Sequence, residues 1–109
     1  MTEPAYHVHR WDEIALEKVT EMVSRKVVAG ARMSVAQVYL KRGSLVPLHA
    51  HESEQITCVL QGALRFVVQG EEVTLREGEV VHIPGAVEHQ AEALEDTFVL
   101  DLFSPVRTQ

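Results

Sequence analysis

Four residues in the middle of the chain have the types and the spacing of a metal site. His49 and His51 form a His-x-His pair, and Gln55 follows four residues after His51. On an extended strand, residues two and four positions apart project from one face, so both imidazoles and the amide can meet one cation. His89 follows a Pro84-Gly85 turn, from which a neighbouring strand can present it. From the residues alone, two interpretations stay open: a solvated surface pair, or a site for one divalent metal per chain, for which zinc, nickel, manganese, cobalt and iron would all suit these ligands.

The other histidines give a useful contrast. His7 and His9 repeat the His-x-His spacing, but they lie in a polar stretch without a third ligand nearby, so we interpret them as solvated. His82 is surrounded in sequence by Val80, Val81 and Ile83, which favours a histidine in the core or at an interface.

A second group of chemically capable residues lies near the C-terminus. In the stretch from Thr97 to Ser104, a period of two places Asp101 on one face together with Val99 and Phe103. The opposite face is wholly apolar and is expected to pack; it carries Phe98, Leu100 and Leu102. An acid between apolar neighbours needs a wet pocket or a partner. Arg107 can supply that partner, either as a structural ion pair at a rim or as part of a functional pocket.

The elements that must position these residues are predicted to be short strands separated by turns. Turn residues end each β-rich run from about Lys26 onward, which is typical of an antiparallel sandwich or barrel. The predicted strands are Ser34–Leu40, Gln55–Leu60, Leu64–Gln69, Val73–Leu75, Val80–Ile83 and Thr97–Phe103. The four glycines expected at the turns with a positive φ are Gly43, Gly62, Gly70 and Gly78. The stretch 12–23 fits neither helix nor strand periodicity cleanly, and we expect it to be mostly extended.

Length and composition exclude several classes of protein. A chain of 109 residues predicts a single domain, which we divide into an N-terminal extension (1–25) and a barrel (26–104). Asp and Glu outnumber Lys and Arg by 16 to 10, which argues against a nucleic-acid partner. No apolar run is long enough to span a bilayer, and residues 1–11 do not resemble a signal peptide. Cys58 is the single cysteine and is expected to face away from the metal. A chain with one cysteine cannot form an internal disulfide, which favours a location in the reducing cytoplasm.

Two stretches resemble the sequence motifs of the cupins. Residues 43–62, G-S-L-V-P-L-H-A-H-E-S-E-Q-I-T-C-V-L-Q-G, are similar to the first cupin motif, and residues 78–89, G-E-V-V-H-I-P-G-A-V-E-H, to the second. The resemblance implies an all-β jelly-roll barrel. It also implies that the metal ligands are His49, His51, Gln55 and His89. Two departures are that Gln55 stands where most cupins carry Glu, and that Pro84-Gly85-Ala86 replaces the usual Pro-x-Gly.

The C-terminal segment D-L-F-S-P-V-R resembles, more narrowly, the small pectin-degradation cupins, which ketonise 4,5-unsaturated monouronates. That resemblance implies catalytic roles for Asp101, Phe103 and Arg107. Asp101 would move the proton that opens the hemiacetal ring, Arg107 would clamp the substrate carboxylate, and Phe103 would pack on the sugar. The implied partner is thus a small carboxylate-bearing substrate.

A neutral Gln55 leaves both positive charges on the metal, which favours Lewis-acid chemistry over oxidation to a trivalent state. Two alternatives stay open: a cupin oxygenase acting on a diketone or an aromatic diol, and a metal- or sugar-binding module without activity. We also expect a homodimer, because Phe98, Leu100 and Leu102 could form an apolar contact face.

Overall fold

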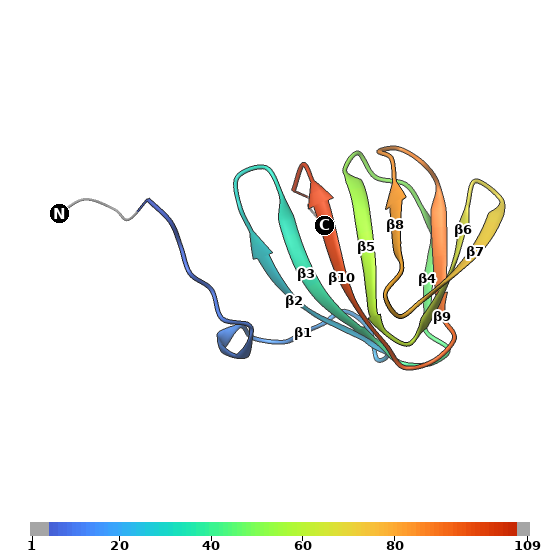
Figure 1. Cartoon of the computed structure of the whole chain (residues 1–109), viewed down its shortest axis with the longest axis horizontal. Helices are drawn as coiled ribbons and strands as arrows, with labels where there is room; N and C mark the ends of the chain where they lie inside the picture. Colours follow the sequence, from blue (N-terminus) through green and yellow to red (C-terminus); the bar gives the residue numbers. More distant parts are fainter. Residues whose placement is uncertain (1–4, 107–109) are drawn as a thin grey trace.

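The computed structural model describes residues 5–106, which form a β-barrel of two facing antiparallel sheets (Figure 1). Apart from one 3₁₀ turn, η1 (Trp11–Glu13), every regular element in this part of the chain is a strand. The strands are β1 (Glu17–Lys18), β2 (Val23–Ala29), β3 (Ser34–Leu40), β4 (Leu45–His49), β5 (Glu54–Gln61), β6 (Ala63–Val68), β7 (Glu71–Arg76), β8 (Val80–Ile83), β9 (His89–Ala93) and β10 (Thr97–Ser104).

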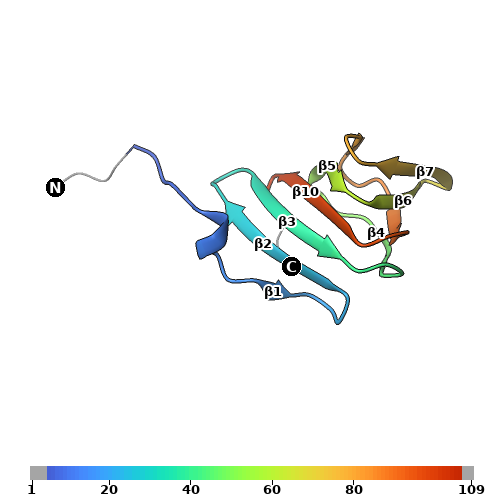
Figure 2. The ribbon, with the colours of Figure 1, turned by 60° about the horizontal axis from the view of Figure 1, so that its bottom comes forward.

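The two sheets divide the strands unequally. The larger sheet has the order β1-β2-β3-β10-β5-β8, and the smaller has the order β4-β9-β6-β7. Non-consecutive neighbours such as β3 and β10 mean that the chain crosses repeatedly from one sheet to the other, which is the connectivity of a jelly roll. In Figures 1 and 2, β1, β2 and β3 extend beyond the smaller sheet, and residues 5–10 run away from the barrel.

Alternation along the strands builds the core between the sheets. On β3, every second residue from Ser34 to Leu40 is buried, and on β5 the buried residues are Gln55, Thr57 and Val59. β10 adds Val99 to the same sheet, and β6 and β9 contribute Leu64, Phe66 and Ala91 from the facing sheet. Polar residues therefore share the barrel interior with the apolar core, and they gather toward the ends of β5 and β10 where these strands carry Gln55 and Asp101.

Most of the predicted strands are present within one or two residues of their expected ends. Ser34–Leu40 and Val80–Ile83 agree at both ends. The stretch 12–23, which we expected to be mostly extended, contains little strand: its regular parts are the end of η1, the two-residue β1 and Val23 at the start of β2, with bends between them. β2 begins at Val23, ahead of the expected start of the barrel at residue 26, and β4 and β9 are strands that the pattern did not reveal.

The four turn glycines all have the positive φ that the sequence predicts. At Gly62, φ is 93°, and a Cβ atom would lie 2.5 Å from the carbonyl oxygen of Asp96. Only glycine therefore lets the β5–β6 turn lie against the start of β10. No helix within residues 5–106 has the length and apolar character needed to cross a membrane.

Candidate metal centre

His49 points into the barrel because a bulge interrupts β4. Val46 pairs with Ala91 and His49 pairs with His89, so three residues on β4 correspond to two on β9. Val46 and His49 both line the interior although an odd number of positions separates them. The bulge supplies the extra residue that turns His49 inward, a common device beside binding sites. Pro47, which lacks an N–H, is tolerated here because β4 is an edge strand.

His51 reaches the same place from a loop. We predicted that His49, His51 and Gln55 share the face of one extended strand, and this is wrong in detail: β4 ends at His49 and β5 begins at Glu54. The chain bends between them, and His51 is held by the loop itself. Its Nδ1 bonds the carbonyl oxygen of Ser53 at 2.8 Å, and the Ser53 hydroxyl donates to the carbonyl oxygen of Pro105 at 2.6 Å.

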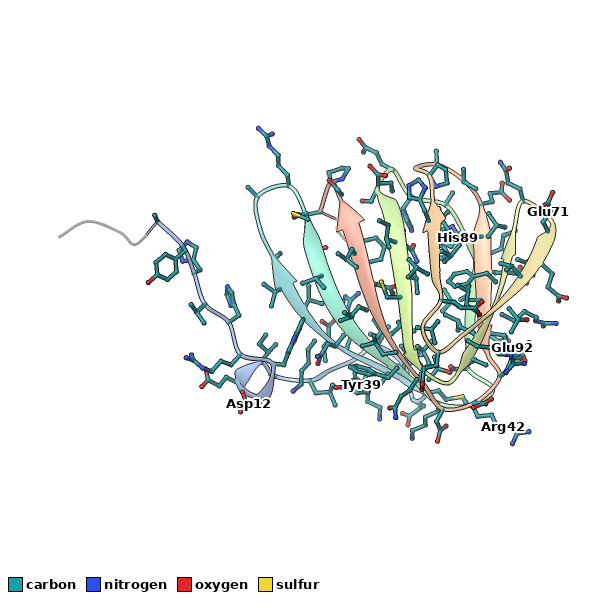
Figure 3. The ribbon with its side chains drawn as sticks, in the orientation of Figure 1. Asp12, Tyr39, Arg42, Glu71, His89 and Glu92 are labelled. Carbon is teal, nitrogen blue, oxygen red and sulfur yellow. The ribbon has the colours of Figure 1, made fainter. Side chains whose placement is uncertain are left out.

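The three histidines converge, with ligating nitrogens that all lie within 4.8 Å of one another. The rings of His49 and His89 have centroids 4.3 Å apart, and those of His51 and His89 lie 5.0 Å apart. His89 is only 2% exposed, and Figure 3 shows it between the two sheets. The predicted origin of His89 on a neighbouring strand is confirmed, because β9 pairs with β4.

Each of these histidines is oriented by a backbone carbonyl. Nδ1 of His49 lies 2.8 Å from the oxygen of Pro47, and Nδ1 of His89 lies 2.9 Å from the oxygen of Val87, as Nδ1 of His51 does from Ser53. A carbonyl oxygen only accepts, so Nδ1 donates in all three cases and the lone pair of the neutral ring is on Nε2. Such carbonyl contacts are typical of the outer shell of a metal site.

Gln55 is oriented by a hydrogen-bond chain that ends at Asp101. The Thr57 hydroxyl donates to Oδ1 of Asp101 at 2.5 Å, and it accepts from the amide nitrogen of Gln55 at 2.8 Å. Because the carboxylate takes the only Thr57 proton, the nitrogen of the Gln55 amide must face Thr57. The amide oxygen then faces His51, with Oε1 3.1 Å from Nε2. Sequence reasoning did not single out Thr57, although its even step from Gln55 was the available signal.

The donor set fits a divalent cation. When the His51 ring is neutral and donates from Nδ1, its Nε2 is an acceptor like Oε1 of Gln55, so a cation between the two atoms would satisfy both. Two ligands about 2.1 Å from one metal lie about 3.0 Å apart at a right angle and about 3.4 Å apart at a tetrahedral angle. The observed 3.1 Å falls in that range. Three imidazoles and one amide oxygen therefore suit a cation of the type that histidine-rich sites bind.

A cavity of about 200 Å³ lies next to this group, inside the barrel. Its wall includes His49, Gln55, His89, Asp101 and Phe103. The Phe103 ring meets the His51 ring edge to face, with centroids 5.6 Å apart. This volume is below the roughly 300–1,000 Å³ of pockets for drug-sized ligands, so it restricts the occupant to a small molecule.

Comparison with known protein families shows to which family the chain belongs. The model of the cupin domain matches residues 36–104, which is more than half of the chain and includes every described ligand candidate. The chain belongs to the cupin family. The predicted all-β jelly-roll fold is confirmed with it.

Two relatives and one solved structure narrow the position of this cupin within the family. It is 28% identical to the pectin degradation protein KdgF of Dickeya dadantii, over 88% of this chain and 90% of that protein. It superposes on the structure of KdgF from Halomonas sp. with a TM-score of 0.83 and 37% identity, covering 88% of this chain and 92% of the other. An uncharacterised protein of Methanocaldococcus jannaschii is 27% identical over 68% of the chain, which spans only 60% of that longer relative.

The remaining predicted residues of the cupin have mixed outcomes. The predicted face of Val99, Asp101 and Phe103 is confirmed, since all three line the cavity. Arg107 lies outside the described residues.

His82 is not in the core: its neighbours on β8 face inward, and its own ring is exposed and bonds Glu54 at 2.9 Å. His7 and His9 are exposed as expected. Cys58, an odd step from Gln55, is half-buried on the opposite face of β5.

Proposed function

We propose that this cupin is a metal-dependent enzyme that ketonises small 4,5-unsaturated uronates. The observation that carries the proposal is the hydrogen-bond chain from Asp101 through Thr57 to the Gln55 amide. It joins a candidate general acid/base to a candidate metal ligand, within one small cavity. Similarity to two KdgF proteins, one of them named for pectin degradation, supports the substrate class.

His49, His51, His89 and Gln55 are proposed to hold the cation. When bound, a divalent cation would supply Lewis-acid polarisation of a substrate oxygen. A neutral amide in this set leaves the full charge of the cation in place, whereas a carboxylate would neutralise part of it. The chain's own contribution is orientation, because the carbonyl contacts of the three imidazoles and the Thr57 contact of the amide fix each donor before a ligand arrives.

Asp101 is proposed to move the proton that starts the reaction. The carboxylate would take the proton of the hemiacetal hydroxyl, and the bond from that carbon to the ring oxygen would break to give an aldehyde. The ring oxygen, once protonated, is an enol, and transfer of a proton to the neighbouring alkene carbon yields the ketone. The step is an isomerisation that needs no oxidant. The Thr57 hydroxyl bond holds Asp101 toward the cavity during this transfer.

Phe103 and Arg107 are proposed to position the sugar. Phe103 forms part of the cavity wall beside His51, where an apolar ring can pack on a sugar face. Arg107 follows Pro105, whose carbonyl oxygen is tied to the His51 loop through Ser53. This tie brings the start of the C-terminal segment to the metal site, and the guanidinium would clamp the substrate carboxylate by charge-assisted hydrogen bonds.

The test is the loss of near-ultraviolet absorbance from a 4,5-unsaturated monouronate. We expect the metal-loaded protein to accelerate this loss above the spontaneous rate, and Asp101→Asn to slow it by roughly 10²–10⁴-fold with metal content unchanged. Replacing His49 and His51 together by Ala should abolish both metal binding and turnover. A parent protein that holds metal but does not accelerate the loss would overturn the proposal, and oxygen uptake would then indicate the oxygenase alternative.

A further inference from the structure

Arg25 adds a positive charge to the wall of the same cavity. It lies on β2 and pairs with Val38 of β3, so its side chain shares the inner face of the larger sheet. Among the described residues that line the cavity, Arg25 is the only arginine or lysine, and it shares that wall with His49, His89 and Asp101. The sequence gives it no motif and no conspicuous spacing.

The placement of Arg25 departs from the pattern of its strand. The neighbouring positions on the same face of β2 are valines, the buried Val23 and the 37% exposed Val27, and apolar residues dominate the cavity wall around Arg25. Placing a cation on the inner face of a barrel is costly unless it is paired and hydrogen-bonded. Where a sequence breaks its own apolar pattern in this way, a functional site is a common reason.

The hydrogen bonds of Arg25 are incomplete within the described chain. Its Nη2 donates to Oε1 of Glu17 at 3.1 Å, across the β1–β2 pair. A guanidinium has five N–H donors, and the Nε atom of Arg25 is buried without a partner among residues 5–106. The side chain of Arg25 is 27% exposed and that of Glu17 is 57% exposed, so the ion pair leaves the arginine largely inside and the acid largely in solvent.

We propose that Arg25 receives the carboxylate of the small acid that occupies the cavity. The substrate class rests on the proposed function; the assignment to Arg25 rests on the burial, charge and missing acceptor of this side chain. A carboxylate has two oxygens and about four lone-pair sites, so it can accept from Arg25 and from Arg107 together.

The distance between Arg25 and Asp101 suits such a ligand. One strand separates β2 from β10, and the register places Arg25 two residues away from the level of Asp101. With strands about 4.8 Å apart and a rise of about 3.4 Å per residue, the two Cα atoms are about 12 Å apart. A small acid can contact both side chains at once only if its long axis runs from Arg25 to Asp101. In a 4,5-unsaturated uronate the carboxylate and the hemiacetal hydroxyl stand on opposite sides of the ring oxygen, as this arrangement requires.

The test compares Arg25→Gln, Arg25→Lys and Glu17→Gln with a matched control, Arg65→Gln. Arg65 also has a buried Nε, but it stands on the outer face of the smaller sheet and its terminal nitrogens bond Glu72 and Glu92. Binding of D-galacturonate and of galactose to the metal-loaded proteins is measured by titration calorimetry. Turnover of the unsaturated monouronate is measured in parallel, with metal content and thermal unfolding as checks on folding.

We expect Arg25→Gln to weaken galacturonate binding by roughly 10- to 100-fold and to leave galactose binding unchanged, because a charge-assisted hydrogen bond is lost. The same variant should raise KM more than it lowers kcat. Arg25→Lys should recover part of the affinity, since it keeps the charge without the planar fork. Glu17→Gln should bind galacturonate as well as the parent or better, because a competing carboxylate is removed.

Equal losses in Arg25→Gln and Glu17→Gln would overturn the inference, since they would show that the pair only fastens β1 to β2. Unchanged galacturonate affinity and unchanged KM in Arg25→Gln would also overturn it, while parental turnover would leave the proposed function standing. Conversely, a parent that binds galacturonate through Arg25 but turns nothing over would refute the proposed function and uphold the inference. A parent that neither binds nor converts any uronate refutes both.

Discussion

At the scale of single residues, the three imidazoles of the metal centre are oriented through Nδ1, the ring nitrogen that contacts a backbone carbonyl. His49 and His89 each bond the carbonyl oxygen two residues before them, and His51 bonds the one two residues after it. These are local contacts, so the short segments around the histidines fix the tautomer largely by themselves. The Gln55 amide differs, because its orientation depends on Thr57 and on Asp101 from a different strand.

Gln55→Glu tests the importance of a neutral ligand. A carboxylate would lower the Lewis acidity of a bound cation, and it also lacks the N–H that the amide donates to Thr57. We expect turnover of the unsaturated monouronate to fall about 10-fold or more, while metal affinity holds or tightens. Metal content by elemental analysis and steady-state rates are measured on the same preparations. A variant as fast as the parent would show that the charge at position 55 is incidental.

At the scale of elements, the centre depends on both sheets. β4 and β9 of the smaller sheet supply His49 and His89, whereas β5 and β10 of the larger sheet supply Gln55 and Asp101. His51 comes from the loop that connects them, and this loop is held by the turn after β8. The backbone N–H of Ala86 donates to the carbonyl oxygen of His51 at 2.7 Å. The departure from the family's Pro-x-Gly spacing therefore falls on a turn that touches the metal site.

Substitutions at Gly85 and Ala86 in this turn are expected to have opposite effects, because a Cβ does not fit at Gly85 and is unfavourable at Ala86. A Cβ at Gly85 would lie 2.4 Å from the carbonyl oxygen of Glu52, a backbone atom that must then move and carry the His51 loop with it. We expect Gly85→Ala to weaken metal binding about 10-fold. Ala86 already has a φ of 65°, which is unfavourable for alanine.

The matched variant Ala86→Gly should therefore raise the free energy of unfolding by about 1 kcal/mol and leave metal affinity unchanged. Metal titration and denaturant unfolding of both variants provide the measurement. Equal metal affinity in Gly85→Ala and the parent would show that the turn does not set the position of His51.

The sequence predicted the elements whose alternation is clean and missed those whose signal is mixed. Ser34–Leu40 and the inward face of Asp101 follow from a period of two. β4 contains a proline and a bulge, and the bulge, which turns His49 inward, leaves no mark in the residue types. Thr57 was likewise not singled out: its even step from Gln55 places it on the same face, but a threonine on a strand is ordinary. Motif resemblance therefore placed the histidines in the centre, while the strand geometry offered for it was wrong.

At the scale of the whole molecule, the outer face of the larger sheet carries a group of apolar residues, although the chain has a net charge of -6. Phe98, Leu100 and Leu102 lie on this face of β10 and are half-buried. Tyr39 stacks on Phe98 with ring centroids 4.6 Å apart and is 40% exposed, and Ile56 on β5 is 38% exposed. Contiguous exposed apolar surface of this kind marks interaction sites in soluble proteins. Because the face lies on β3, β10 and β5, whose other side lines the cavity, we expect a second copy of the chain to cover it.

Leu100→Glu tests this homodimer, because Leu100 lies on the central strand of the apolar face. We expect the parent to sediment at twice its 12.2 kDa chain mass and the variant to sediment as a monomer, since a buried unpaired carboxylate is costly. Leu45→Glu is the matched control: Leu45 is 66% exposed on the smaller sheet and should leave the dimer intact. Sedimentation equilibrium over a range of concentrations gives the masses, and metal content shows whether the barrel has survived the substitution. A monomeric parent would show that the chain forms no dimer. A dimer that Leu45→Glu dissociates and Leu100→Glu does not would show that the contact lies on the smaller sheet. In either case the apolar face would need another occupant.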